Sequence, residues 1–114
     1  RYDSEGFLPL TMTVAINGVE FGRDLLSNMG WPFAELVAYA SRNSRVMPGD
    51  VLGSGTAGSG CLAEIWGRAG SQTPRPVQAG DVVTMNIEGI GEISNLVAPP
   101  ETLPAVPRAR ARRG

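Results

Sequence analysis

Histidine is absent from the 114 residues of the sequence. This absence excludes Ser-His-Asp and Cys-His nucleophile arrangements, and it excludes every zinc site that depends on imidazole ligands. Lysine is absent as well, because all ten basic residues are arginines. A Walker-type phosphate loop requires a lysine before its Ser or Thr, so the sequence also excludes that class of nucleotide site.

Cysteine is almost absent: Cys61 is the only one. No internal disulfide can form, and we expect Cys61 to be a small buried side chain in a protein of the reducing cytoplasm. No apolar run reaches the roughly 18 residues of a membrane span, so no membrane association is expected. The first residue is Arg1 and no secretory signal opens the chain, which suggests a processed, cut or incomplete polypeptide.

Basic charge is concentrated at the C-terminus, although the net charge is only -1. Four arginines fall in the last seven residues and follow a proline-rich stretch: Arg108, Arg110, Arg112 and Arg113. This composition predicts a flexible, solvated tail over residues 99–114, and it is also compatible with a segment that contacts phosphate or an acidic partner. The acidic body and the lack of lysine weigh against nucleic-acid binding.

Two segments of the first half predict regular structure. Residues 10–16, "LTMTVAI", alternate apolar and polar side chains and precede Asn17-Gly18, a dipeptide favoured in type I′ hairpin turns. Pro32 then precedes apolar residues at helical spacing, which are Phe33, Leu36, Val37 and Ala40. We therefore predict a β-hairpin followed by one amphipathic helix over about residues 32–42.

The second half repeats a Gly-Asp turn before a β-branched run, in "MPGDV" at 47–51 and "QAGDVV" at 78–83. Each turn predicts the start of a strand, and residues 82–97 predict a hairpin across Gly89-Ile90-Gly91. The expected total is five to seven strands and one helix. The fold class is therefore α+β and mostly β.

Residues 51–60, "VLGSGTAGSG", concentrate four glycines around Thr56. The spacing Gly53-x-Gly55-x-x-Gly58 matches a dinucleotide-binding fingerprint. However, the segment "CLAEIW" after it is short for the crossover helix that such a site requires. The acid that should bind the ribose about 20 residues further on would be Asp81, which lies in a predicted turn. Glycine can serve a tight turn, or it can let backbone N–H groups approach an anionic ligand. The residues alone leave both interpretations open.

The strings "MPGDVLGSGTAGSGCLAEIWG" and "VQAGDVVTMNIEGIGEISNLV" resemble the C-terminal part of the fumarylacetoacetate hydrolase (FAH) family. The upstream "TVAINGVE" and "PFAELVAYASR" resemble family segments too. The resemblance implies an irregular lead-in over residues 1–9, part of an FAH-like catalytic domain over 10–98 and the tail over 99–114. It also implies a mixed antiparallel β-sandwich or roll.

The resemblance implies a metal-dependent hydrolase of carbon–carbon bonds in β-dicarbonyl or 2-oxo (diketo) acids, such as fumarylacetoacetate or acylpyruvate-like compounds, through a metal-held enolate. A role in the catabolism of tyrosine and other aromatic compounds would follow. The alternatives are an oxaloacetate-type decarboxylase, a tautomerase or isomerase, or a non-catalytic dimerisation or binding module. Gly55 and Thr56 match the family's substrate-binding loop, whereas no catalytic residue is identified.

The family resemblance also implies a homodimer and a cation, Mg²⁺ or alternatively Ca²⁺ or Mn²⁺. The family's Glu-x-Glu metal ligands have no counterpart in this sequence; Asp3 and Glu5 come closest. Glu64 and Glu88 are isolated acids, for which we predict strand-surface or salt-bridge roles. We therefore expect the metal ligands outside this chain, which would be the substrate-loop half of an active site and incomplete on its own.

Overall fold

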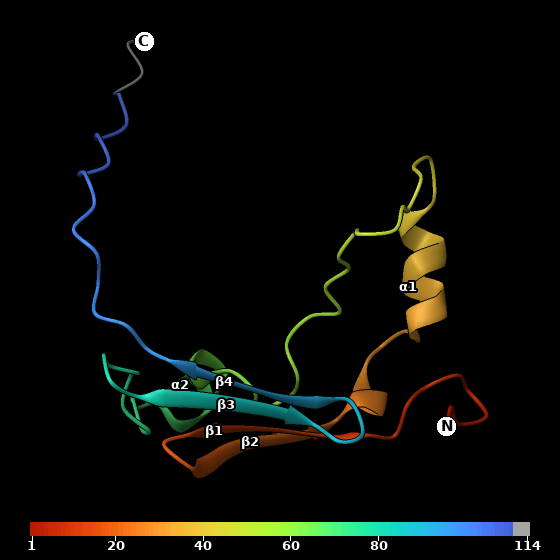
Figure 1. Cartoon of the computed structure of the whole chain (residues 1–114), viewed down its shortest axis with the longest axis horizontal. Coiled ribbons are helices and arrows are strands. Elements are labelled where there is room, and N and C mark those ends of the chain that lie inside the picture. Colours follow the sequence, from red (N-terminus) through yellow and green to blue (C-terminus); the bar gives the residue numbers. More distant parts are fainter. Residues whose placement is uncertain (111–114) are drawn as a thin grey trace.

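The computed structural model describes residues 1–110, which form one four-stranded antiparallel sheet with two α-helices (Figure 1). The strand order is β2-β1-β3-β4. The elements are β1 (Thr11–Ile16), β2 (Val19–Leu25), the 3-10 helix η1 (Leu26–Asn28), α1 (Phe33–Ala40), α2 (Leu62–Ala69), β3 (Val82–Ile87) and β4 (Gly91–Leu96). The predicted α+β, mostly β class is confirmed.

The predicted first hairpin is confirmed as β1 and β2. Asn17 and Gly18 both have positive φ, at 51° and 78°, as a type I′ turn requires. Ile16 pairs with Val19 directly beside the turn. The second predicted hairpin, β3 and β4, is confirmed too.

The two hairpins join through their first strands. β1 pairs with β3 in antiparallel register, from Met12 opposite Ile87 to Ile16 opposite Val83. Alternation along these strands gives the sheet one apolar face and one polar face. The apolar face carries Met12, Val14, Ile16, Val83, Met85, Ile87 and Ile93.

The apolar face is only partly covered. Among the described hydrophobic side chains Leu26 alone is buried, whereas Met85 is 42% exposed and Ile93 is 60% exposed. β4 is an exposed edge strand along its whole length. The apolar face of the sheet therefore leaves apolar surface accessible. The β4 edge leaves backbone hydrogen-bonding groups accessible.

The prediction of a strand after "MPGDV" is wrong. The turn itself forms, because Gly49 has a φ of 101° and an Asp50 carboxylate oxygen accepts the Met47 N–H at 2.9 Å. Residues 47–60 then continue without a strand, and Val51 is 92% exposed. A strand requires a hydrogen-bonded neighbour, which β3 finds in β1 and Val51 lacks. Four strands form in residues 1–110 instead of five to seven.

The helix predicted over about 32–42 is confirmed as α1, but the prediction of a single helix is wrong. Residues 62–69 form α2 despite Gly67 near its end. Arg68 and Glu64 form an i,i+4 ion pair at 2.9 Å, and Gly70 ends the helix with a left-handed φ of 65°. The described strands also form one sheet, and a second layer of a sandwich or roll is not found in residues 1–110.

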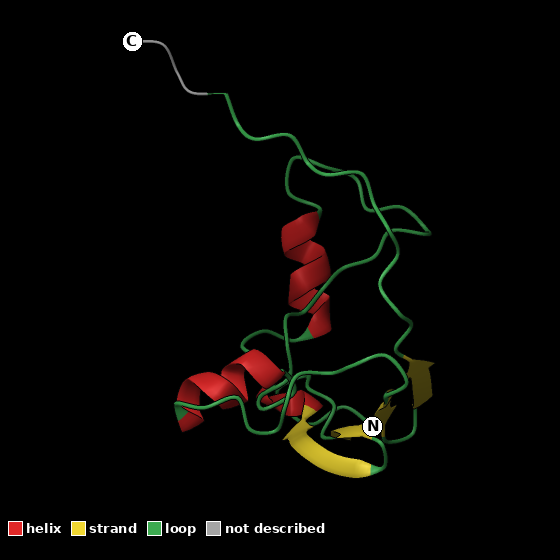
Figure 2. Ribbon diagram, turned by 90° about the vertical axis from the view of Figure 1, so that its left-hand side faces the viewer, coloured by secondary structure: helices red, strands yellow, loops and turns green. Residues whose placement is uncertain are grey.

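α1 projects away from the sheet, and residues 99–110 extend from the end of β4 without a helix or strand (Figures 1 and 2). Residues 99–110 are exposed throughout, which includes Arg108 and Arg110. Arg112 and Arg113 lie outside the described residues. No helix within residues 1–110 has the length and apolar character needed to cross a membrane.

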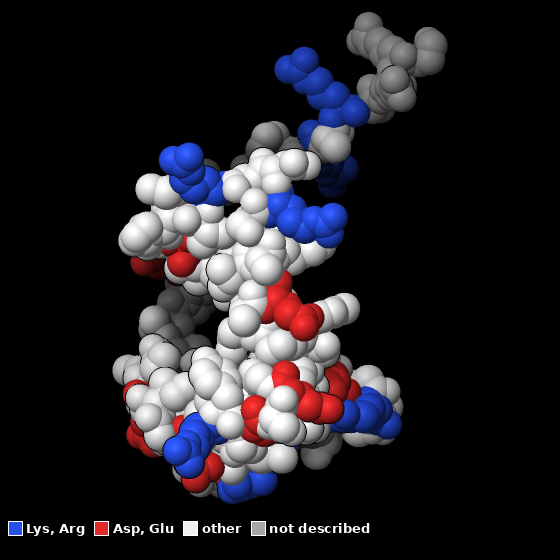
Figure 3. Space-filling view, turned by 90° about the vertical axis from the view of Figure 1, so that its right-hand side faces the viewer, with Lys and Arg blue, Asp and Glu red and all other residues white. Residues whose placement is uncertain are grey.

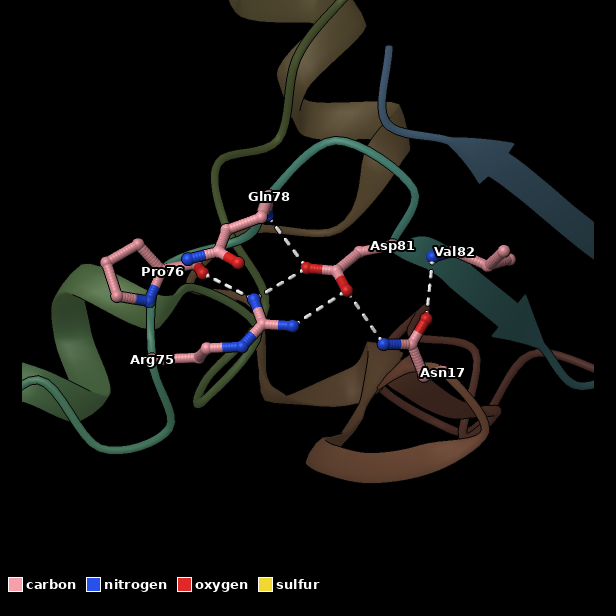
Figure 4. Close-up of polar contacts among 6 residues, drawn as sticks. All are labelled: Asn17, Arg75, Pro76, Gln78, Asp81 and Val82. Atoms are coloured by element: carbon pink, nitrogen blue, oxygen red, sulfur yellow. Dashed lines mark hydrogen bonds and ion pairs between the residues drawn. The ribbon is translucent and has the colours of Figure 1, made fainter. Parts of the chain in front are cut away.

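A buried carboxylate joins the two hairpins (Figure 4). Asp81 is 5% exposed and accepts two hydrogen bonds from the Arg75 guanidinium, at 2.8 and 2.9 Å. It also accepts the Asn17 side-chain amide at 2.8 Å and the Gln78 N–H at 2.7 Å. Asn17 in turn accepts the Val82 N–H at 2.9 Å. The first hairpin turn, the start of β3 and the segment before it are thereby tied together.

The hydrogen bonds from Arg75, then those from Asn17 and Gln78, hold the pKa of the Asp81 carboxyl well below its usual range. A lowered folded-state pKa stabilises the fold above the unfolded-state value of about 4, and this stabilisation is lost as the pH falls below that value. We therefore expect Asp81→Asn to lower the melting temperature at neutral pH by about 5 °C or more.

Thermal unfolding followed by circular dichroism from about pH 2 to 7 measures this effect. The wild-type protein loses stability below about pH 4 more steeply than Asp81→Asn, because only the wild type has this carboxylate to protonate. Glu92→Gln, which removes an exposed acid on β4, is the matched control and follows the wild type. Identical pH profiles for Asp81→Asn and wild type would show that the ionised Asp81 carboxylate does not stabilise the fold.

Candidate functional site

Residues 53–60, here called the Gly-Thr loop, precede α2 and lie beside the C-terminal end of β2. The loop forms one wall of a pocket of about 230 Å³. Both predicted substrate-binding residues, Gly55 and Thr56, line this pocket. The other lining residues are Met12, Asp24, Leu25, Leu26, Asn28, Met29, Ser54, Ala57 and Gly58. Substrate binding by Gly55 and Thr56 stays a prediction.

The glycines of the loop serve two purposes. Gly55 has a φ of 91°, a conformation that side-chain-bearing residues adopt only with strain. Gly58 allows close packing instead, because a Cβ atom there would lie 2.6 Å from an Asp24 carboxylate oxygen. Gly22 of β2 is constrained in the same way, since its Cβ would collide with the Ser59 carbonyl oxygen. The loop therefore sits directly on β2.

Asp24 anchors the loop to β2, and sequence reasoning missed this residue. One carboxylate oxygen accepts the Gly58 N–H, and the other accepts the Leu25 N–H at 2.8 Å and the Asn28 side-chain amide. The hydrogen bond from Asn28 is the main cause that lowers the pKa of Asp24, and those from Leu25 and Gly58 add to it. Asp24 and Gly58 are 34 residues apart, so no local sequence pattern indicates their contact.

The same C-terminal end of the loop is also fixed by α2. Glu64 accepts the Ser59 N–H at 3.0 Å and pairs with Arg68, which itself donates to the Ser59 hydroxyl at 2.9 Å. The predicted salt-bridge role of Glu64 is confirmed.

Glu88 accepts the Thr11 N–H at 3.1 Å, a structural contact between β1 and the turn after β3. Cys61 is half-buried, which corrects the expectation of a buried side chain, because it lies at the N-cap of α2, where residues 59–62 are only partly covered.

The tip of the loop keeps donors for a ligand. The Gly58 and Ser59 N–H groups are bound to Asp24 and Glu64, and the Gly60 N–H is bound to the Ala57 carbonyl. By contrast, the Gly55 and Thr56 N–H groups and the Thr56 hydroxyl make no hydrogen bond to other described residues. An oxygen atom of a small ligand in the pocket could accept from these groups.

The structure excludes a dinucleotide site, but the reason is not the lack of a helix that the sequence suggested. A helix does follow the glycines, because α2 begins at Leu62. However, residues 47–60 contain no strand, and all strand pairs in the described sheet are antiparallel. The parallel β-α-β unit that a dinucleotide site requires is therefore absent from residues 1–110.

The described residues do not fit a metal site. Within residues 1–110, no three His, Cys, Asp or Glu side chains are grouped so that they could hold a cation. Asp24 and Glu64 are the acids nearest the loop, and both carboxylates accept hydrogen bonds from its backbone. A hard cation requires several convergent oxygen ligands, so we assign no chemical step to a cation held by these side chains.

Two further surfaces do not have the properties of a catalytic site. A larger, mostly apolar hollow of about 750 Å³ lies along α1, lined by Trp31, Glu35, Leu36, Ala38, Tyr39 and Arg42. None of these residues belongs to the Gly-Thr loop.

On the face drawn in Figure 3, the described acidic and basic side chains are interspersed and form no continuous basic surface that would suit a nucleic acid.

The packing of Gly58 generates a testable prediction. Gly58→Ala places a methyl group against the Asp24 carboxylate, so we expect faster amide hydrogen exchange at Ser59 and a lower melting temperature. Gly53→Ala is the control, because a Cβ at Gly53 has no atom within 4 Å. Exchange rates and melting temperatures that are the same for both variants would show that Gly58 does not need its close approach to Asp24.

The comparison with known families gives a match over most of the chain. The family model described as fumarylacetoacetate (FAA) hydrolase C-terminal matches residues 3–98, which include the sheet, both helices and the Gly-Thr loop. Neither the curated protein sequences nor the solved structures contain a match to the chain. The family match covers most of the sequence, and the chain therefore belongs to the fumarylacetoacetate hydrolase family, as a C-terminal portion of its domain.

Proposed function

We propose that this chain supplies the substrate-binding loop of an enzyme that hydrolyses a carbon–carbon bond in β-dicarbonyl or 2-oxo (diketo) acids. The observation that carries the proposal is the pocket beside Gly55 and Thr56, in the segment that matches the enzyme family. The backbone and hydroxyl donors of the pocket belong to a loop that is anchored at its C-terminal end by Asp24 and Glu64.

The chemistry of the loop is binding and orientation. Hydrogen bonds from the Thr56 hydroxyl and the neighbouring N–H groups would hold a carbonyl oxygen of the substrate in one position. Such positioning lowers the entropic cost of reaching the transition state. The anchors at Asp24 and Glu64 matter here because a loop fixed before binding has less freedom to lose.

The proposal includes a cation, Mg²⁺ or alternatively Ca²⁺ or Mn²⁺, whose ligands would lie outside residues 1–110. It also includes a homodimer, because large apolar side chains are exposed. Trp31 is 64% exposed and Ile93 is 60% exposed. The same apolar surface favours the second candidate function, a binding or dimerisation module without catalysis.

Turnover by the complete protein separates these functions. We expect hydrolysis of an acylpyruvate to pyruvate and a carboxylate, dependent on added Mg²⁺ and abolished by a chelator. Release of CO₂ from oxaloacetate with no acylpyruvate hydrolysis would identify a decarboxylase instead. If the folded protein turned over neither compound with Mg²⁺, Ca²⁺ or Mn²⁺, the binding-module function would replace the hydrolase.

Thr56 provides a residue-level test. Thr56→Ala removes the hydroxyl donor, so we expect kcat/KM for the turned-over substrate to fall by about tenfold or more. Thr56→Ser keeps the hydroxyl and retains most of the activity. Thr102→Ala, in the exposed segment after β4, is the control with wild-type kinetics. Unchanged kinetics in Thr56→Ala would remove Thr56 from the site.

A further inference from the structure

The pocket beside the Gly-Thr loop has an acidic and apolar wall. Asp24 contributes a carboxylate, and Met12, Leu26 and Met29 contribute apolar surface. The polar side chains around it, from Asn28, Ser54 and Thr56, are uncharged. No arginine is among the described lining residues, and lysine and histidine are absent from the whole sequence. Nothing in this wall offers a cation to an anionic ligand.

The charge of Asp24 is stabilised but not neutralised. Its three hydrogen-bond donors are uncharged groups: the Gly58 N–H, the Leu25 N–H and the Asn28 amide. These bonds lower the pKa of the carboxyl, so Asp24 is ionised at neutral pH. The three ion pairs in the described part of the chain are Arg23 with Glu20, Arg68 with Glu64 and Arg75 with Asp81, and none involves Asp24.

The size of the pocket limits what can approach this charge. A volume of about 230 Å³ lies below the roughly 300–1,000 Å³ of sites for drug-sized ligands. The part of a ligand that enters this pocket is therefore a short group, and its end lies close to the pocket wall. A second carboxylate at that end would meet an uncompensated negative charge at short range, partly shielded from water. An alkyl end would contact the methionine and leucine side chains without this penalty.

We propose that Asp24 is a specificity-determining residue, which makes this pocket accept the uncharged tail of an oxo monocarboxylic acid and reject the second carboxylate of a dicarboxylic acid. The inference rests on the proposed function and narrows its substrate class to dioxo acids with a neutral tail. Fumarylacetoacetate-like substrates, which carry a carboxylate at both ends, are disfavoured.

The test compares two oxo acids of equal length, 2-oxohexanoate and 2-oxoadipate, by calorimetric titration into the complete protein at about pH 7 with saturating Mg²⁺. Neither compound has the β-dicarbonyl group, so the titration reports binding without hydrolysis. We expect the wild type to bind 2-oxohexanoate at least about tenfold more tightly, and high salt to reduce this ratio.

Asp24→Asn keeps the shape of the side chain and removes its charge, so the affinity ratio should fall by about tenfold. The variant also loosens the contact with Gly58, which weakens both ligands; the ratio is the readout because it cancels this common loss. Glu92→Gln removes an acid on the opposite edge of the sheet and keeps the wild-type ratio.

Three results would overturn the inference: equal or tighter binding of 2-oxoadipate by the wild type, no binding of either acid, or an Asp24→Asn ratio equal to that of the wild type. Failure of acylpyruvate turnover is a separate outcome. It would reject the proposed hydrolase and leave the measured charge selectivity of the pocket standing.

Discussion

The hydrogen-bonded ion pair between Asp81 and Arg75, extended to Asn17, is the interaction on which the rest of the structure depends. Each hairpin can form from local contacts, but a two-stranded hairpin alone is at best marginally stable. Their union requires β1 and β3 to meet across more than 60 residues of chain, which costs conformational entropy. The buried Asp81 offsets this cost by joining the first turn to the start of β3, and its own burial is tolerable because four donors satisfy it.

The sheet formed in this way positions the Gly-Thr loop. β2 presents Asp24 and Gly22 to the C-terminal end of the loop, and α2 holds the same end through Glu64. The contacts use the N–H groups of the last loop residues and leave the Gly55–Thr56 tip with its donors available to a ligand. The anchor that orders the loop also brings a negative charge into the pocket wall. The order of the loop and the proposed charge selectivity thus share one physical source, the Asp24 carboxylate.

Local sequence patterns predicted the elements whose conformation depends on neighbouring residues. Asn17-Gly18 specifies a type I′ turn because both positions tolerate positive φ, and Pro32 with its apolar spacing specifies α1. The strand after Asp50 was predicted from the same Gly-Asp turn as β3, but only β3 has a partner strand. α2 was missed because eight residues with an internal glycine form a weak local helix signal.

The residues themselves therefore set the α+β class, the two hairpins, α1 and the position of the glycine-rich loop, because turn stereochemistry and side-chain periodicity act over a few residues. The tertiary structure alone decided that Asp24 contacts Gly58, that Asp81 is buried against Arg75 and Asn17, and that the pocket wall is acidic. These contacts join residues up to 64 positions apart, and their energies arise from burial and hydrogen bonding that exist only after the chain has folded.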